Sequence, residues 1–109
     1  MTSERIGALD HRLTIEAPSR TSDGGGGAAI IWTLVDEVWG AMRPISASES
    51  LDAEGLKGRV SHEIVIRFRP GVSPKMRFRL AARLFDIRSA VDAEEEHRFL
   101  RCLVEERLT

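Results

Sequence analysis

The feature that most constrains the fold is an alternation between apolar and polar residues in the middle of the chain. In two runs, at 60–69 and 76–80, every second residue is apolar or histidine. Successive side chains of a β-strand point to opposite faces, so this period of two predicts two strands that each bury one face. The residues expected on the buried face are Val60, His62, Ile64, Ile66, Phe68, Met76, Phe78 and Leu80.

The opposite face of both expected strands is basic. The triplet Arg-Phe-Arg occurs at 67–69 and again at 77–79, and the sequence PGVSPK lies between the two triplets. We therefore expect a β-hairpin with the phenylalanines on its core face and the arginines on its outer face. A platform that stacks bases needs aromatic and cationic side chains on the same surface, so the triplets do not predict base recognition. The four arginines of the outer face are Arg67, Arg69, Arg77 and Arg79.

These like charges need compensation, because equal charges opposite each other on neighbouring strands destabilise a sheet. The candidates are carboxylates of a neighbouring strand, carboxylates of a neighbouring subunit and phosphates, and a solvated face screened by salt is the remaining alternative. Residues 57–88 hold nine basic and two acidic residues, a net charge of +7, so the rest of the chain holds −8 within the total of −1. Such a split indicates a polyanionic partner, or copies of the chain that meet basic face to acidic face.

The N-terminal half predicts further strands. Residues 11–17 alternate and are followed by Pro18, which we expect to end the first strand. The glycine-rich segment 19–29 has no phosphate-binding motif and predicts a loop. Residues 30–45 predict two strands joined by a tight turn near 36–37, with Trp32 and Trp39 as core anchors, unless one of them lies in a subunit contact.

Two segments leave alternatives open. Residues 46–58 begin with Ser46 and Glu49 at the spacing of a capping box, and they predict a short helix or a loop that is either a spacer or a functional arm. Residues 83–91 alternate as a strand does. Residues 92–109 fit a helix, or an acidic turn at 92–97 followed by a strand that buries Leu100, Cys102 and Val104.

No catalytic or metal-binding pattern is present in the sequence. His11, His62 and His97 lack the spacing of metal ligands, and no serine lies in the context of a nucleophile elbow. The lone Cys102 is expected to be a packing residue. No apolar run reaches the roughly 20 residues of a membrane-spanning helix, and the first ten residues lack the apolar core of a secretory signal. We expect one soluble domain over 1–109, with no enzymatic activity and no cofactor.

The order of several short motifs resembles that of the phage head-tail joining family, the head-closure or stopper proteins of siphovirus-like phages and gene transfer agents. The resemblance extends over nearly the whole chain. It rests on LDHRLTI at 9–15, Asp23 and the glycines after it, Trp32, Val38-Trp39, Ser48-Glu49, His62, IRFR at 66–69, Gly71, PKMR at 74–77, FDI at 85–87 and CLVEE at 102–106.

The resemblance implies an all-β fold, a small antiparallel β-barrel with a long loop or short helix after the third strand, and it favours the strand alternative near the C-terminus. It also implies a virion protein that forms a ring below the portal and its adaptor, closes the DNA-filled head and docks the tail. The partners implied are other copies of the chain, the portal adaptor, a tail terminator or tail tube protein, and packaged double-stranded DNA passing through the channel, with no membrane. The location implied is the neck of a virion or phage-like particle assembled in the host cytoplasm.

In this family the long loop projects into the channel, and the matching stretch here is 46–59. The resemblance makes this loop a channel or subunit contact with the candidate residues Glu49, Asp52, Glu54, Lys57 and Arg59. The four outer arginines would then meet the acidic turn at 94–96 of a neighbouring copy or an adaptor. The alternative function is a stand-alone β-barrel that binds nucleic acid through its basic segment.

Overall fold

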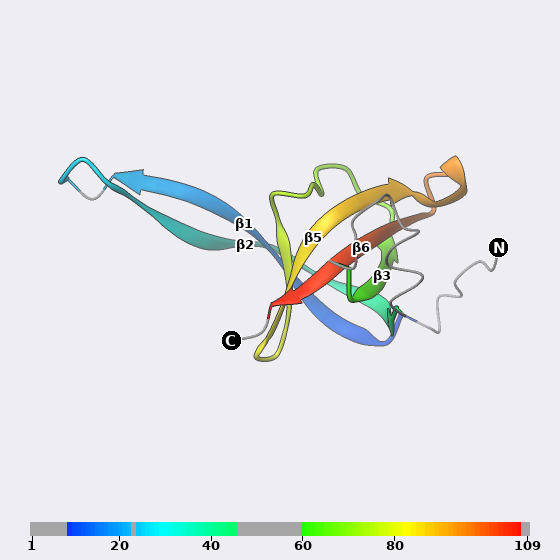
Figure 1. The fold of residues 1–109 in the computed structure, drawn as a ribbon. Helices are drawn as coiled ribbons and strands as arrows, with labels where there is room; N and C mark the ends of the chain where they lie inside the picture. The colour runs from blue at the N-terminus through cyan, green and yellow to red at the C-terminus, as the bar shows by residue number, and fades with distance from the viewer. Residues whose placement is uncertain (1–8, 23, 46–59, 108–109) are drawn as a thin grey trace.

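The chain folds into a closed antiparallel barrel of six strands, and we describe it from a computed structural model that defines residues 9–22, 24–45 and 60–107. The strands follow the order β1-β2-β3-β6-β5-β4 around the barrel (Figure 1). Their bounds are β1 His11–Ser22, β2 Ala28–Pro44, β3 His62–Arg67, β4 Arg77–Leu80, β5 Arg83–Asp92 and β6 Phe99–Arg107, with a short 3-10 helix, η2, at Ala93–Glu95. The all-β barrel expected from the sequence is therefore confirmed.

The core fills the inside of the barrel with aliphatic and aromatic side chains from β1, β3, β4, β5 and β6. In β3, Ile64 and Ile66 are fully buried and Arg67 is exposed, as the alternation predicted, but Val65 on the opposite face is also buried, at 4% exposure. His62 is half-buried on the same face, with its ring 5.3 Å from that of Phe85. The buried cluster consists of Leu13, Ile15, Ile64, Ile66, Phe78, Phe85, Ile87, Leu100, Cys102 and Val104.

The expected hairpin between the two Arg-Phe-Arg triplets is wrong. β3 pairs with β2 and β6, whereas β4 pairs with β1 and β5, so the two triplets lie in strands that are not neighbours. The segment 68–76 crosses from one strand to the other and is held at its start by the Phe68 amide, which donates to the Arg98 carbonyl at 3.0 Å. β4 instead forms a tight hairpin with β5 through Ala81 and Ala82. Alternation predicted the core residues Ile64, Ile66 and Phe78 correctly, but Val65 and Arg77 of the outer face are also buried, and the pattern contains no information about neighbouring strands.

The turn expected near 36–37 is also absent. β2 continues for 17 residues as one strand, and the register with β1 passes from Ile15 opposite Asp36 to Glu16 opposite Leu34. Val35 is the extra residue of a β-bulge, which bends a strand without ending it. β1 likewise continues through Pro18 to Ser22, where it pairs only with β2. Proline lacks a backbone N–H group, and it is tolerated here because one edge of β1 has no neighbouring strand among the described residues that would accept a hydrogen bond from it.

The tryptophans are not core anchors. Trp39 is 52% exposed, and Trp32 is half-buried outside the core cluster. The segment 46–59 lies outside the described residues and connects β2 to β3, so it follows the second strand of the barrel and not the third.

The C-terminal ambiguity is resolved in favour of a strand. β6 buries Leu100, Cys102 and Val104, as the strand alternative predicted. The acidic turn before it bends through positive φ at Glu94 and Glu95, which a continuous α-helix does not contain. Burial raises the pKa of the Cys102 thiol to about 12, in line with a packing role. Within the described residues, no helix is long and apolar enough to cross a membrane.

Candidate assembly surfaces

The most prominent feature outside the barrel is an arm formed by the far half of the β1–β2 hairpin, residues 17–22 and 24–34 (Figure 1). β4 pairs with β1 only as far as Glu16, and β3 pairs with β2 only from Gly40 onward, so among the described residues both edges of the arm lack a neighbouring strand. The arm extends the molecule to 51 Å along its longest axis, against 28 and 26 Å along the others.

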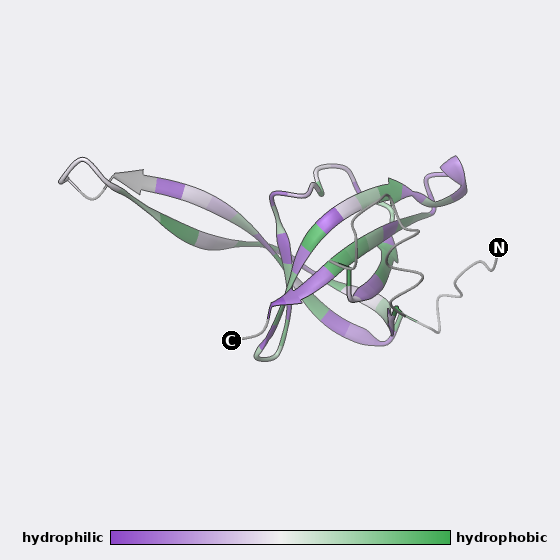
Figure 2. Cartoon of the chain, viewed as in Figure 1, coloured by the Kyte–Doolittle hydropathy of each residue, from purple (hydrophilic) through white to green (hydrophobic). Residues whose placement is uncertain are grey.

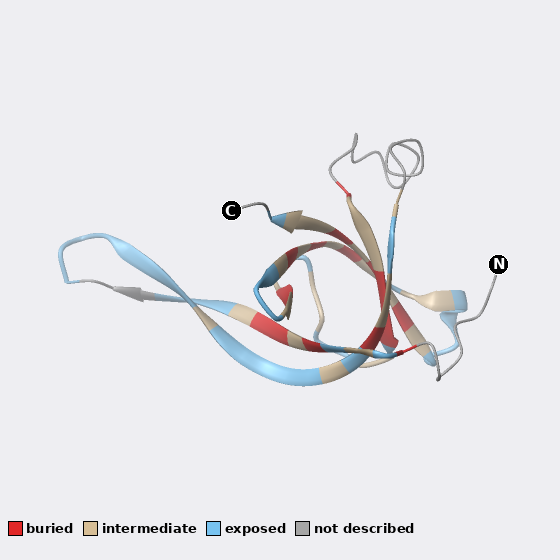
Figure 3. Cartoon of the chain, turned by 90° about the horizontal axis from the view of Figure 1, so that it is seen from below, coloured by how far each residue is buried: buried red, intermediate tan, exposed pale blue. Residues whose placement is uncertain are grey.

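The arm is apolar although it is exposed. Among its described residues the only charged side chain is Arg20, in a chain with 30% charged residues. Ile30, Ile31 and Leu34 are 55%, 51% and 57% exposed. Figure 2 shows the hydrophobic colour along β2 of the arm, and Figure 3 shows that the same region is exposed while the buried residues lie in the barrel. Exposed apolar surface of this kind typically marks an interaction site.

One face of the arm continues the outer face of the barrel. Cross-strand partners share a face, and the register pairs Glu16 with Leu34, Pro18 with Trp32 and Arg20 with Ile30. We call the residues of this face beyond Glu16 the arm docking face: Pro18, Arg20, Ile30, Trp32 and Leu34.

A buried ionic cluster fixes the base of the arm. Glu16 and Arg77 are 8% and 6% exposed, and the Glu16 carboxylate accepts hydrogen bonds from Arg77 Nε at 2.7 Å and Arg79 Nε at 2.9 Å. The Arg77 guanidinium also lies 4.0 Å from the centre of the Trp32 ring. Burial opposes ionisation of Glu16, but the hydrogen bonds and charges of Arg79 and Arg77 outweigh it and lower the pKa of the carboxyl group.

The structure thus shows how the expected basic face is compensated. Arg77 and Arg79 pair with Glu16 of the neighbouring strand, and Arg69 Nη1 lies 2.6 Å from Asp36 of β2. The Arg69 hydrogen bond is also the largest cause of the lowered pKa of Asp36. Arg67, the last residue of β3, is exposed and has no carboxylate partner within the described part of the chain.

The charge split along the sequence is partly compensated by strand pairing. β5 lies beside β6, where Arg83 of β5 binds Glu106 of β6 through two hydrogen bonds of 2.8 and 3.0 Å. Arg88 pairs with Glu105 in the same way. The hydrogen bond from Arg83 lowers the pKa of Glu106. Basic residues that are clustered in the sequence are therefore partly paired with acidic residues from distant parts of the sequence.

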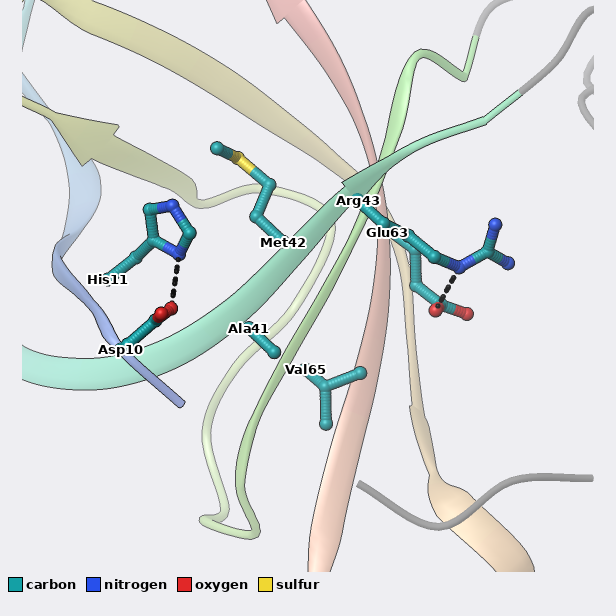
Figure 4. Close-up of a pocket in the computed structure, with 7 residues that line it drawn as sticks. All are labelled: Asp10, His11, Ala41, Met42, Arg43, Glu63 and Val65. Atoms are coloured by element: carbon teal, nitrogen blue, oxygen red, sulfur yellow. Dashed lines mark hydrogen bonds and ion pairs between the residues drawn. The ribbon is translucent and has the colours of Figure 1, made fainter. Parts of the chain in front are cut away.

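A shallow hollow of about 300 Å³ lies at the opposite end of the hairpin from the arm. In Figure 4, Ala41 and Val65 lie between the Asp10–His11 pair on one side and the Arg43–Glu63 pair on the other. The Asp10 side chain is 72% exposed, and its carboxylate lies 3.0 Å from His11 Nδ1. The hollow combines a small apolar floor with an accessible carboxylate.

The candidate residues of the sequence analysis are only partly brought together. Arg77 and Arg79 share one cluster, whereas Arg67 and Arg69 lie at the end of β3 and beyond it. The five loop residues Glu49, Asp52, Glu54, Lys57 and Arg59 lie outside the described residues. Sequence reasoning missed Glu16 and the arm, although the nearly uncharged run 24–35 beside four glycines is a pattern that indicates it. Over the described ranges, no group of three His, Cys, Asp or Glu residues is placed to hold a metal ion.

Comparison with known proteins gives one family and two informative structures. A family model described as "Phage head completion protein" matches residues 5–107. A chain of the virion of a native gene transfer agent particle is 29% identical, with a TM-score of 0.68 over 92% of this chain and 96% of that chain. Protein SF1141 from Shigella flexneri 2a, at 23% identity, has the same fold, with a TM-score of 0.73 over 94% of this chain and 96% of that chain. No curated protein matches the chain significantly.

Proposed function

This chain belongs to the phage head completion protein family, and from that premise we propose that it is a structural neck protein that joins head to tail. Several copies form a ring below the portal and its adaptor. The ring closes the DNA-filled head and presents a surface on which a tail terminator or tail tube protein docks, while double-stranded DNA passes through its channel.

The observation that carries this proposal is the extent of the similarity. The family match covers almost the entire sequence, and the chain of the gene transfer agent virion aligns over nearly its full length with the same barrel. The described residues add an exposed apolar arm, which suits a component of an assembly better than a free monomer. The role is structural, and we propose no enzymatic activity, cofactor or membrane partner. The protein would act in the neck of a virion or phage-like particle assembled in the host cytoplasm.

The segment 46–59 is the proposed channel loop. The paired ends of β2 and β3, with Pro44 opposite His62, place its two attachment points side by side at one end of the barrel. Within this loop, Glu49, Asp52, Glu54, Lys57 and Arg59 are the proposed channel or subunit contacts, an assignment that rests on the family resemblance alone.

The outer arginines remain a proposed subunit contact with the acidic turn at 94–96 of a neighbour. Arg67 is the member best placed for this role, because it is exposed whereas Arg69, Arg77 and Arg79 already pair with carboxylates. Glu94 and Glu95 are likewise exposed. Charge reversal by Arg67→Glu therefore tests the contact without disturbing the buried cluster, which a reversal of Arg77 would disrupt. Assembly unaffected by Arg67→Glu would remove Arg67 from the interface.

Deletion of the gene and electron microscopy of the resulting particles test the function directly. We expect full or leaking heads beside free tails, and tailed particles again when the wild-type gene is supplied from a plasmid. Normal numbers of tailed particles in the deletion strain would exclude the joining role.

The competing function, a free nucleic-acid-binding barrel, makes a different prediction. It requires DNA binding by the isolated protein with a steep loss of affinity as salt rises. The internal pairing of Arg69, Arg77 and Arg79 weighs against it, because these guanidiniums already contact the carboxylates of Asp36 and Glu16. Fluorescence anisotropy with a short DNA duplex at two salt concentrations distinguishes the two functions.

A further inference from the structure

We propose that the arm docking face of one copy binds the hollow at the opposite end of the hairpin on the next copy, so that copies join head to tail. This inference rests on the proposed function, because it assigns the contact that would hold the ring together. The arm is the donor surface, and the hollow bounded by Asp10, Ala41, Arg43, Glu63 and Val65 is the acceptor surface.

The arm favours a partner because the described part of its own chain leaves it uncovered. A two-stranded hairpin without a third strand is only marginally stable in water. Both edges of the arm are open, and its large aliphatic side chains are more than half exposed. An exposed, apolar strand edge favours association with another chain. Ile30 and Leu34 on the docking face therefore gain most from burial against a second surface.

Charge identifies the acceptor. The docking face carries one charge, Arg20, which is exposed and has no carboxylate partner among the described residues. In the hollow, Glu63 is already held by Arg43 at 3.0 Å and Arg101 at 3.1 Å. Asp10, whose carboxylate lies 3.0 Å from His11 Nδ1, is the more exposed carboxylate, and it lies beside a floor made by Ala41 and by Val65, which is 4% exposed. Arg20 beside Asp10 would place aliphatic side chains of the arm over that floor, and the charge pair would fix the orientation.

Position indicates that the acceptor belongs to a second copy. β1 begins at the hollow with His11 and reaches Arg20 nine residues later, so the two surfaces lie about 30 Å apart on one chain. Arm and hollow cannot meet within one molecule. Two different surfaces at opposite ends of a protomer make a heterologous contact, which closes into a ring when the rotation between copies allows it.

A cysteine pair tests the contact in the assembled particle. Ile30→Cys and Ala41→Cys in one chain place the two thiols at opposite ends, and Cys102 is fully buried. We expect mild oxidation, in which copper phenanthroline accepts the two electrons and two protons are released, to link neighbouring copies into a ladder of dimers, trimers and higher species. The matched control is Thr33→Cys with Ala41→Cys, because Thr33 lies on the opposite face of the arm. Single-cysteine variants should give dimers at most.

The outcomes separate this inference from the proposed function. Particles that contain the chain but give no ladder, or a link from position 30 to a different particle protein, overturn the second-copy contact and leave the joining role intact. Tailed particles that lack the chain altogether overturn the joining role itself.

A charge exchange gives an independent test. We expect Arg20→Glu to lower the yield of tailed particles about tenfold, because it places two carboxylates together at the contact. Adding Asp10→Arg to this variant should recover most of the loss. A double variant no better than Arg20→Glu alone, or an Arg20→Glu variant with a normal yield, would refute the pairing.

Discussion

At the scale of single residues, the junction between barrel and arm depends on Glu16. Its carboxylate is the shared acceptor for Arg77 and Arg79, and Arg77 in turn lies against Trp32 of the arm. A buried guanidinium that loses its counter-charge retains the full cost of desolvation. The sequence did not single out Glu16, because an isolated glutamate in an alternating strand looks like any outward-facing residue.

Glu16→Gln should lower the free energy of unfolding by roughly 2 to 4 kcal/mol, since it leaves two arginines without a carboxylate while preserving side-chain shape. Urea denaturation followed by tryptophan fluorescence measures the change. Glu37→Gln is the matched control, because its pair with Arg12 is exposed on both sides and should contribute at most about 1 kcal/mol. Equal effects of the two substitutions would contradict the structural role of Glu16.

The same carboxylate should make stability depend on pH. The pKa of Glu16 is lowered in the folded chain from the ordinary 4.5, so the folded state binds fewer protons than the unfolded state as the pH falls below that value. Its stabilisation is complete above about pH 4.5 and is lost as the pH falls through the lowered pKa. The difference in unfolding free energy between wild type and Glu16→Gln should shrink in acid, as urea titrations at a series of pH values would measure. A difference that stays constant would show that ionisation of Glu16 is not what stabilises the cluster.

At the scale of elements, the sequence predicted which faces are buried but not which strands are neighbours. The alternation around Ile64, Ile66 and Phe78 predicts which face of each strand is buried. Any antiparallel arrangement that encloses the core buries the same face, so the pattern does not determine which strands pair. The crossing of segment 68–76 and the continuity of β2 through its bulge depend on contacts between distant segments. Trp32 and Trp39 illustrate the same limit, because residue type predicts burial and the barrel places both outside its core.

Gly40 shows how closely the strands of the hairpin approach their neighbours. A Cβ atom there would lie 2.6 Å from Leu13 Cδ1 and 3.1 Å from both Ile66 Cγ2 and the Val65 carbonyl oxygen. Gly40→Ala should therefore destabilise the fold by about 1 to 3 kcal/mol through overpacking, as thermal or urea unfolding would measure. Ala41→Ser, one position along on the outer face, should change stability by less than about 0.5 kcal/mol. A Gly40→Ala variant as stable as wild type would show that Leu13 relaxes freely.

The arm should be the least protected part of the sheet in the free protein. Its backbone hydrogen bonds join only two strands and are open to solvent on both edges, so local opening costs little. Hydrogen exchange followed by NMR should find fast exchange at Ile31 and Thr33 and slow exchange at Ile64 and Cys102 in the core strands. Core-like protection in the arm of a monomer would show that the hairpin is stable without a partner.

At the scale of the whole molecule, barrel and arm are structurally separable. Ion pairs between neighbouring strands engage several arginines of the basic segment within the barrel, as with Arg83 and Glu106. The arm contributes no residue to the core cluster and carries the largest exposed aliphatic side chains. The strand pairings that close the barrel, at Glu16 with Arg77 and Gly40 with Ile66, lie outside the arm. Folding should therefore survive loss of the arm, whereas assembly should not.

Replacing residues 18–32 by Asn-Gly joins Ala17 to Thr33, which already face each other, through a two-residue turn suited to a β-hairpin. We expect a soluble, folded barrel that is about 1 kcal/mol less stable, because Arg77 loses its contact with the Trp32 ring. Circular dichroism and urea unfolding measure the fold and the stability of the shortened chain. We expect the shortened chain to be absent from particles, which an immunoblot measures after complementation of a deletion strain. A shortened chain that still enters particles and restores tails would place the ring contacts on the barrel itself, whereas one that cannot fold would make the arm part of the folding unit.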